Sequence, residues 1–148
     1  MSRITVLLVD DHTVVREGFR KLVEIDSDLL VVGEASDGRS AVEMAIKLRP
    51  DVVVMDIAMP RLNGLAATRQ LLKLQPAARV LILSAHGDES YIKGAMEAGA
   101  KGYLLKQASK EEVSQAIRAV AQDQPFFSIH VPGSPAEATV RPSARLRI

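Results

Sequence analysis

The chain has 148 residues, of which 47% are apolar, enough for one globular domain with a sizeable core. Its formal net charge of +1 provides no overall field that would favour nucleic acid or a membrane surface. The absence of cysteine excludes a disulfide framework, a thiolate metal site and a thiol nucleophile. The chain starts without a signal-peptide layout, and no apolar run approaches the roughly 20 residues that span a bilayer, so we expect a cytoplasmic protein.

Five apolar runs, rich in valine, isoleucine and leucine, predict five β-strands at residues 4–9, 29–35, 52–55, 80–83 and 102–105. Most of them do not alternate apolar with polar residues, which is typical of a parallel sheet covered on both faces. Between the runs, apolar residues recur at helical spacing, first at Val15, Phe19, Leu22 and Val23. Strand and helix alternate five times, which predicts an open α/β sheet with helices on both faces.

The fifth predicted helix is the last regular element. It is expected to begin at Ser109, because Glu112 three residues later completes a capping box. After Gln124 the sequence contains four of the seven prolines and shows no sustained period. We therefore expect residues 1–124 to form the domain and residues 125–148 to form an extended or disordered tail.

Polar side chains directly follow four of the five predicted strands. In chain order they are Asp10, Asp11, Asp56, Ser84 and Lys106. In open α/β sheets, ligands bind outside the carboxyl ends of the strands, so these side chains are expected to meet. The second strand ends at Ala35 and Ser36, as an edge strand far from the site would.

Three carboxylates held together repel one another unless a cation lies between them. Carboxylates without cysteine or clustered histidine favour a hard ion, and Mg²⁺ is the natural choice. A Mg²⁺ ion with free coordination positions recruits phosphate, whose other oxygens could be bound by the hydroxyl of Ser84 and the ammonium of Lys106. The carboxylate of Asp56 could then attack phosphorus and form an aspartyl-phosphate.

Four motifs carry a family resemblance. They are LLVDDH at 7–12, VVVMDIAMPRLNGL at 52–65, LILSAH at 81–86 and GYLLK at 102–106. In this order and spacing they resemble the receiver domain of two-component response regulators, most closely the NarL/FixJ (LuxR-type) subfamily, over about residues 3–124. The resemblance implies a flavodoxin-like, doubly wound (βα)5 fold with a five-stranded parallel sheet in the order 2-1-3-4-5.

The resemblance also implies roles for individual residues. Asp56 would accept a phosphoryl group from a sensor histidine kinase. Mg²⁺ would be bound by Asp11, Asp56 and the backbone carbonyl of Ala58, with Asp10 acting mainly through water. Ser84 and Lys106 would bind the phosphoryl group, and Ser84 together with Tyr103 would form the conformational switch. His86 and Ala58 occupy the two variable positions that flank the phosphoryl site.

The implied partners are a sensor histidine kinase and a second copy of the chain, in a weak or phosphorylation-dependent dimer through the first and fifth helices. DNA would be contacted only through an output domain that this sequence does not contain, and no membrane contact is implied. The protein would be a signalling phosphoacceptor that catalyses only its own phosphorylation and dephosphorylation.

Other classes of protein fit the residues less well. A Mg²⁺-dependent aspartate phosphatase of the haloacid-dehalogenase type would carry a second carboxylate two residues after Asp56, where this chain has Ala58. In a flavodoxin-like cofactor carrier, Asp10 and Asp11 would repel the phosphate. A degenerate receiver that serves only as an interaction module would not need the intact acidic cluster.

Overall fold

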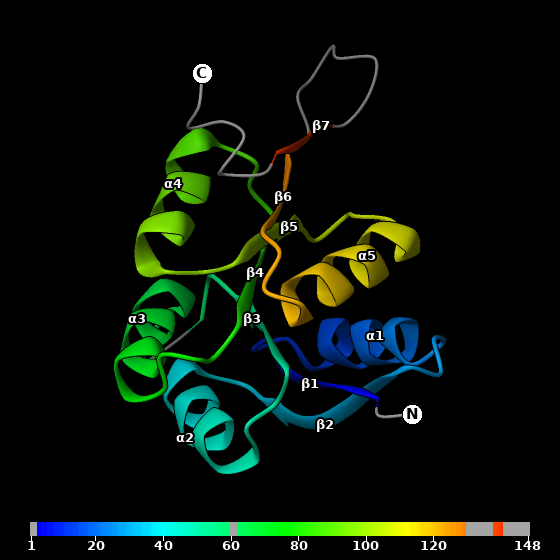
Figure 1. Ribbon diagram of the computed structural model, residues 1–148, viewed down its shortest axis with the longest axis horizontal. Helices are drawn as coiled ribbons and strands as arrows, with labels where there is room; N and C mark the ends of the chain where they lie inside the picture. The colour runs from blue at the N-terminus through cyan, green and yellow to red at the C-terminus, as the bar shows by residue number, and fades with distance from the viewer. Residues whose placement is uncertain (1–2, 60–61, 130–137, 141–148) are drawn as a thin grey trace.

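The computed structural model describes residues 3–59, 62–129 and 138–140 as an α/β domain with one central sheet (Figure 1). The strands are β1 Ile4–Val9, β2 Leu29–Ala35, β3 Val52–Asp56, β4 Val80–Ser84, β5 Gly102–Leu105, β6 Phe126–Ile129 and β7 Ala138–Val140. The helices are α1 Thr13–Val23, α2 Gly38–Leu48, α3 Gly64–Leu74, α4 Glu89–Ala98 and α5 Lys110–Ala121.

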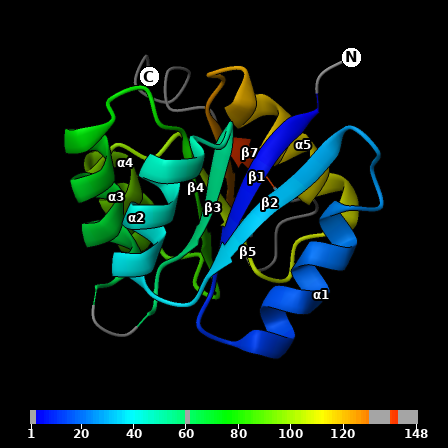
Figure 2. The ribbon, with the colours of Figure 1, turned by 90° about the horizontal axis from the view of Figure 1, so that it is seen from below.

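The sheet is covered on both faces, as the non-alternating strands predict. Helices α1 and α5 cover one face, and α2, α3 and α4 cover the other (Figure 2). Successive strand residues enter opposite cores: Leu7 and Val9 of β1 pack on the side of α2 to α4, while Val6 and Leu8 pack on the side of α1 and α5. A strand buried on both faces has no reason to alternate apolar with polar residues.

The strand order is β2-β1-β3-β4-β5-β6-β7. The first five strands pair in parallel and follow the predicted order 2-1-3-4-5, so the flavodoxin-like fold is confirmed. Strand order reverses between β1 and β3, because β2 lies on the outer side of β1. The carboxyl ends of β1 and β3 therefore flank the switch point at which ligands bind in such sheets.

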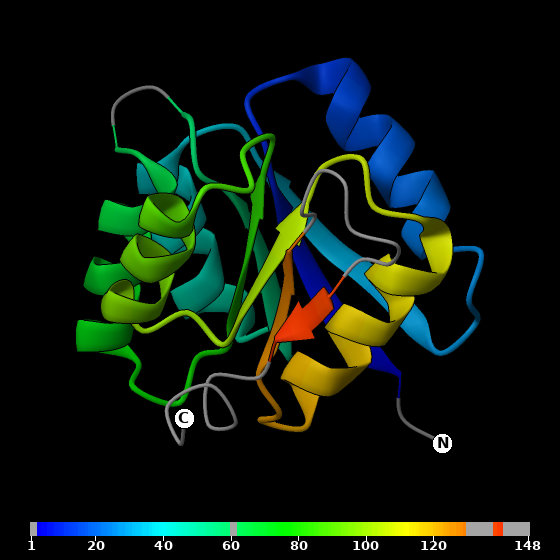
Figure 3. The ribbon, with the colours of Figure 1, turned by 90° about the horizontal axis from the view of Figure 1, so that it is seen from above.

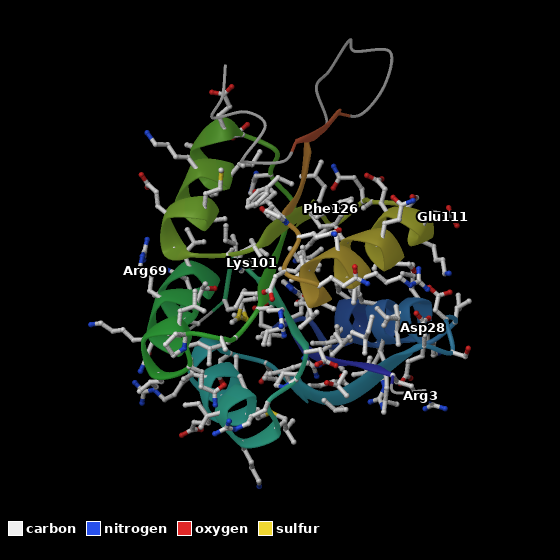
Figure 4. All side chains as sticks on the ribbon, in the orientation of Figure 1. Arg3, Asp28, Arg69, Lys101, Glu111 and Phe126 are labelled. Atoms are coloured by element: carbon white, nitrogen blue, oxygen red, sulfur yellow. The ribbon has the colours of Figure 1, made fainter. Side chains whose placement is uncertain are left out.

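Over the described residues the sheet has seven strands, two more than the five predicted, because β6 and β7 continue it past β5. Strand β6 pairs in parallel with β5, with Phe127 opposite Tyr103, and β7 pairs antiparallel with β6 (Figure 3). The N–H of Phe126 donates to the carbonyl of Lys101 at 3.1 Å, and both residues are labelled in Figure 4. The aromatic rings are the reason for the added strand, because Phe126 is 9% exposed and Phe127 is 1% exposed.

These strands lie in the segment predicted to be an extended or disordered tail. In the described residues this segment contains β6 and β7, which are part of the central sheet, whereas residues 130–137 and 141–148 lie outside the described residues. None of the helices among the described residues is long and apolar enough to cross a membrane.

Helix starts fix where the chain turns after each strand. The capping box at α5 is confirmed: the Ser109 hydroxyl accepts from the Glu112 N–H at 3.2 Å, and the Ser109 N–H donates to the Glu112 carboxylate at 3.3 Å. Asn63 caps α3 with a single hydrogen bond, its side-chain oxygen accepting from the Ala66 N–H at 2.9 Å. The loop that leaves the end of β3 is therefore held at its far end by a defined helix start.

Candidate functional site

The sheet brings the predicted polar residues together at the carboxyl ends of its central strands. Asp56 is the last residue of β3 and Ser84 the last residue of β4, while Asp10 directly follows β1 and Lys106 directly follows β5. Neighbouring strands end nearly level, because Val9 pairs with Met55, Asp56 with Leu83, and Ser84 with Leu105. All five residues selected from the sequence, including Asp11, thus share one edge of the sheet.

Lys106 lies between two carboxylates. Its ammonium nitrogen is 3.2 Å from Asp56 Oδ2 and 3.4 Å from Asp10 Oδ2. Asp56 is 1% exposed and Asp10 is 4% exposed, so both acids are buried at the floor of the site. One lysine faces two buried acids, which leaves the cluster short of positive charge.

Three buried carboxylate oxygens of the cluster, Asp10 Oδ2, Asp11 Oδ1 and Asp56 Oδ2, accept no well-aligned hydrogen bond. The positive charge near the first and third of them comes from the single Lys106 ammonium that they share, and Asp11 Oδ1 lies beside the His12 ring. Together with His12, the three acids place one potential ligand atom each within 4.8 Å of one another. Buried polar atoms are almost always satisfied, so three such oxygens facing one point fit a cation of the carboxylate-binding class.

His12 belongs to the same group but differs from the acids. Its Nδ1 lies 3.1 Å from Asp11 Oδ1 and 3.3 Å from Asp10 Oδ1, and its side chain is 64% exposed. Its backbone N–H donates to Asp10 Oδ1 at 2.8 Å. His12 thus orients one oxygen of Asp10 and leaves Oδ2 to face Lys106.

The electrostatics of the site oppose the charge on Asp56. Burial raises the pKa of Asp56, the negative charge of Asp10 raises it further, and Lys106 counteracts both. For Lys106, burial alone would lower the pKa, but attraction to Asp56 and Asp10 outweighs it and the pKa is raised. Lys106 is therefore a permanent cation at neutral pH, and a second cation would further favour the ionised form of Asp56.

Ser84 and Tyr103 are joined through His86. The Ser84 hydroxyl accepts from the His86 N–H at 3.0 Å, and the Tyr103 hydroxyl donates to the His86 carbonyl. Tyr103 is fully buried at 0% exposure, and burial raises the pKa of its phenol. The tyrosine side chain therefore occupies an inward position, and the backbone of a single residue, His86, links its hydroxyl to that of Ser84.

The loop after β3 is held tightly against Asp56. Gly64 N–H donates to the Ile57 carbonyl at 2.9 Å, and a Cβ at Gly64 would lie 2.2 Å from the backbone oxygen of Asp56. Only glycine allows that approach. The Ala58 N–H reaches Asp56 Oδ1 at 3.4 Å, so this loop also restrains the Asp56 side chain. In the sequence this arrangement corresponds to an Asn-Gly pair at 63–64, a turn signal directly before a helix.

Arg16 is a residue that sequence reasoning did not single out. Its guanidinium donates to the backbone carbonyl of Asp10 at 2.5 Å and to Glu34 of β2 at 2.9 Å. The interpretation of β2 as an edge strand without a role at the site is therefore incomplete. An arginine five residues after Asp11 was visible in the sequence, but its partners at the end of β1 and on β2 were not.

Comparison with known proteins gives a consistent result. The family model described as the response regulator receiver domain matches residues 6–118. The transcriptional regulatory protein DegU of Brevibacillus brevis is 41% identical over 121 residues, which cover 82% of this chain and 51% of that protein. The response regulator GacA of Pseudomonas aeruginosa is 42% identical over 125 residues, which cover 84% of this chain and 58% of that protein. The chain thus spans a little over half the length of these relatives.

Solved structures agree with the sequence comparisons. A two-component response regulator of the LuxR family from Aurantimonas sp. SI85-9A1 superposes with a TM-score of 0.79 at 40% identity, covering 82% of this chain and 86% of that chain. CheY in a CheX–CheY–BeF3–Mg²⁺ complex from Borrelia burgdorferi gives a TM-score of 0.74 at 27% identity, covering 80% of this chain and 90% of that chain. With the acidic cluster, the strand-end lysine and the sheet order already established, the chain belongs to the response regulator receiver domain family, of the transcriptional-regulator type.

Proposed function

We propose that this receiver domain accepts a phosphoryl group on Asp56 from a sensor histidine kinase, in a reaction that requires Mg²⁺. Asp11, Asp56 and the Ala58 carbonyl would bind the ion, with Asp10 acting mainly through water. Ser84 and Lys106 would bind the phosphoryl oxygens. The observation that carries the proposal is the set of three buried carboxylates that share a single lysine and whose inner oxygens accept no well-aligned hydrogen bond.

The chemistry of the donor set supports Mg²⁺ in particular. Carboxylates and a carbonyl are hard oxygen ligands, and Mg²⁺ is commonly bound through one or two carboxylates together with phosphate and water. Bound there, the ion would neutralise charge and supply coordination positions for phosphoryl oxygens. The solved relative that contains Mg²⁺ and BeF3 shares this fold and supports the same assignment.

The proposed step uses the chain's own residues in defined roles. An oxygen of the Asp56 carboxylate attacks phosphorus and forms an O–P bond while the P–N bond of the phosphohistidine breaks. The bonding electron pair leaves with the imidazole nitrogen, which takes up a proton. Lys106 stabilises the charge that accumulates on the phosphoryl oxygens, and Ser84 donates a hydrogen bond to one of them.

We further propose that Tyr103 reports the state of Asp56. Its hydroxyl donates to the carbonyl of His86, and the His86 N–H donates to the Ser84 hydroxyl. When Ser84 turns to a phosphoryl oxygen, that second bond must rearrange and the peptide around His86 shifts. The inward position of Tyr103 would then be stabilised relative to an outward one, and a two-state element of this kind carries the signal to α4, β5 and α5.

Intact mass spectrometry tests the phosphoacceptor. Incubation with Mg²⁺ and acetyl phosphate should add the mass of one phosphoryl group to the protein, and Asp56→Asn should prevent it. Asp51→Asn is a matched control, because Asp51 precedes β3, at the opposite end from Asp56, and its carboxylate accepts from Thr5 instead of facing the site. Unchanged labelling of Asp56→Asn would contradict the assignment.

We also propose a weak homodimer through α1 and α5, which lie side by side on one face of the sheet (Figure 1). Val14 is 81% exposed, Val15 is 42% exposed although it lies on the predicted apolar face of α1, and Ile25 just after the helix is 69% exposed. An apolar contact of this kind supports association. Analytical ultracentrifugation with and without beryllofluoride tests it, and monomers under both conditions at high concentration would exclude the contact.

Several relatives are named transcriptional regulatory proteins, and this chain covers 51% of DegU. We propose that the domain regulates transcription together with a DNA-binding output domain and does not itself read DNA. A polarisation assay of this chain against duplex DNA at physiological salt, with and without beryllofluoride, should show no sequence-selective binding. Selective binding by the chain alone would refute this division of roles.

A further inference from the structure

Arg16, in the first turn of α1, links three elements at the edge of the site. Its Nη1 donates to the backbone carbonyl of Asp10 at 2.5 Å, and its Nε donates to Glu34 Oε1 at 2.9 Å. The arginine side chain is 15% exposed and that of Glu34 is 24% exposed. The guanidinium therefore joins the end of β1 to β2 from a position on α1, largely shielded from water.

The hydrogen bond to the Asp10 carbonyl acts on both acids at once. That carbonyl belongs to the peptide unit between Asp10 and Asp11, and a peptide unit is planar. A hydrogen bond to the carbonyl oxygen restrains the orientation of this peptide plane. It thereby restrains the directions in which the side chains of Asp10 and Asp11 project from their Cα atoms. Both carboxylates carry a buried oxygen that accepts no well-aligned hydrogen bond, and their ligand atoms lie within 4.8 Å of each other. Without a restraint on the peptide, mutual repulsion would favour turning these oxygens apart.

The contribution of Arg16 is geometric more than electrostatic. Its contact with Asp10 is to the backbone, and its positive charge is already paired with Glu34. We infer that Arg16 is a positioning residue for the Mg²⁺ site: by holding the peptide between Asp10 and Asp11, it keeps the two carboxylates in the arrangement that binds the ion. This inference rests on the proposed function and assigns a role in it to a residue outside the acidic cluster.

The chain contains a matched control in Arg20. It lies one helical turn after Arg16 and pairs with the other oxygen of the same glutamate, Glu34 Oε2, at 2.5 Å. It also pairs with Glu24 at 3.3 Å, and its side chain is 43% exposed. Arg16→Gln and Arg20→Gln each remove one positive charge and one bond to Glu34, but only the first removes the donor to the Asp10 carbonyl.

The test is an NMR titration of each purified variant with MgCl2, which gives the Kd for Mg²⁺ without any measurement of phosphorylation. Arg16→Gln should raise this Kd about tenfold or more, as loss of residues that orient metal ligands does. Arg20→Gln should leave it within about twofold, because its pair is partly exposed. The melting temperature in metal-free buffer should fall in both variants, because each loses a bond to Glu34. A lower Tm alone therefore does not distinguish them.

Equal Kd values for Arg16→Gln and the wild type, or equal weakening in the Arg16 and Arg20 variants, would overturn the inference. If Arg16→Gln does not fold, Arg16→Lys replaces it, with Arg20→Lys as control. A lysine ammonium lacks the fork that reaches Glu34 and the Asp10 carbonyl together, so Mg²⁺ should bind more weakly to the Arg16→Lys variant than to its control. A wild-type protein that binds no Mg²⁺ would refute the proposed metal site itself, a result distinct from wild-type binding that Arg16 does not influence.

Discussion

Phe127 provides a direct test of whether β6 belongs to the folded domain. Its ring is 1% exposed and lies in the same core cluster as Tyr103, which it faces across the β5–β6 pair. A buried aromatic side chain removes about 150–250 Å² from water. At about 25 cal/mol per Å², this corresponds to about 4–6 kcal/mol as an upper estimate. Because the alanine side chain still buries part of that area, Phe127→Ala should lower the free energy of unfolding by about 3–5 kcal/mol.

Urea denaturation followed by circular dichroism measures this cost. For an m-value of about 2 kcal/mol/M, the midpoint should fall by about 1.5–2.5 M, with the m-value unchanged. Leu74→Ala is the control, because Leu74 is 58% exposed on α3 and its truncation should change stability by no more than about 0.5 kcal/mol. A midpoint shift for Phe127→Ala as small as that of the control would refute the packing of β6 and support a domain that ends at residue 124.

Three further predictions concern charge and backbone. Asp11→Asn should stabilise the metal-free protein by up to about 1 kcal/mol through reduced repulsion, and should abolish most of the rise in Tm that Mg²⁺ produces; a Tm response equal to that of the wild type would contradict this. Gly64→Ala should lower the free energy of unfolding, measured by urea denaturation, by about 2 kcal/mol or more, because the added Cβ would lie 2.2 Å from a backbone oxygen. Gly18→Ala in α1, where nothing lies within 4 Å, should stabilise and serves as its control. The pKa of Asp26 is lowered from 3.8 to about 2, mainly by its hydrogen bond with Lys110. The ionised Asp26 therefore stabilises the fold above about pH 4, and this stabilisation is lost as the pH falls towards 2. The difference in unfolding free energy between the wild type and Asp26→Asn should shrink over that range and stay constant above it.

The sequence by itself determined the architecture and most of the candidate site. Buried parallel strands need unbroken apolar runs, so β1, β3, β4 and β5 were visible as such runs, and the residues after them were located at the carboxyl edge by the rule for open sheets. Asp56 and Lys106 could be placed at the same edge of the sheet from sequence alone, because each ends or directly follows a parallel strand. Their contact at 3.2 Å, across the end of β4, was given by the structure. The start of α5 was predicted from Ser109 and Glu112, since a capping box is a local interaction within four residues.

Tertiary structure alone decided the contacts between residues distant in the chain. Strand β6 is four residues long, and its Phe126-Phe127 pair shows no period; it forms because the open edge of β5 offers backbone partners and two cores accept the rings. Arg16 occupies a polar position in the helical pattern, and its hydrogen bonds depend on how α1 crosses the ends of β1 and β2. The direction of a long side chain is set by the partners that folding brings within reach, and sequence spacing does not encode them.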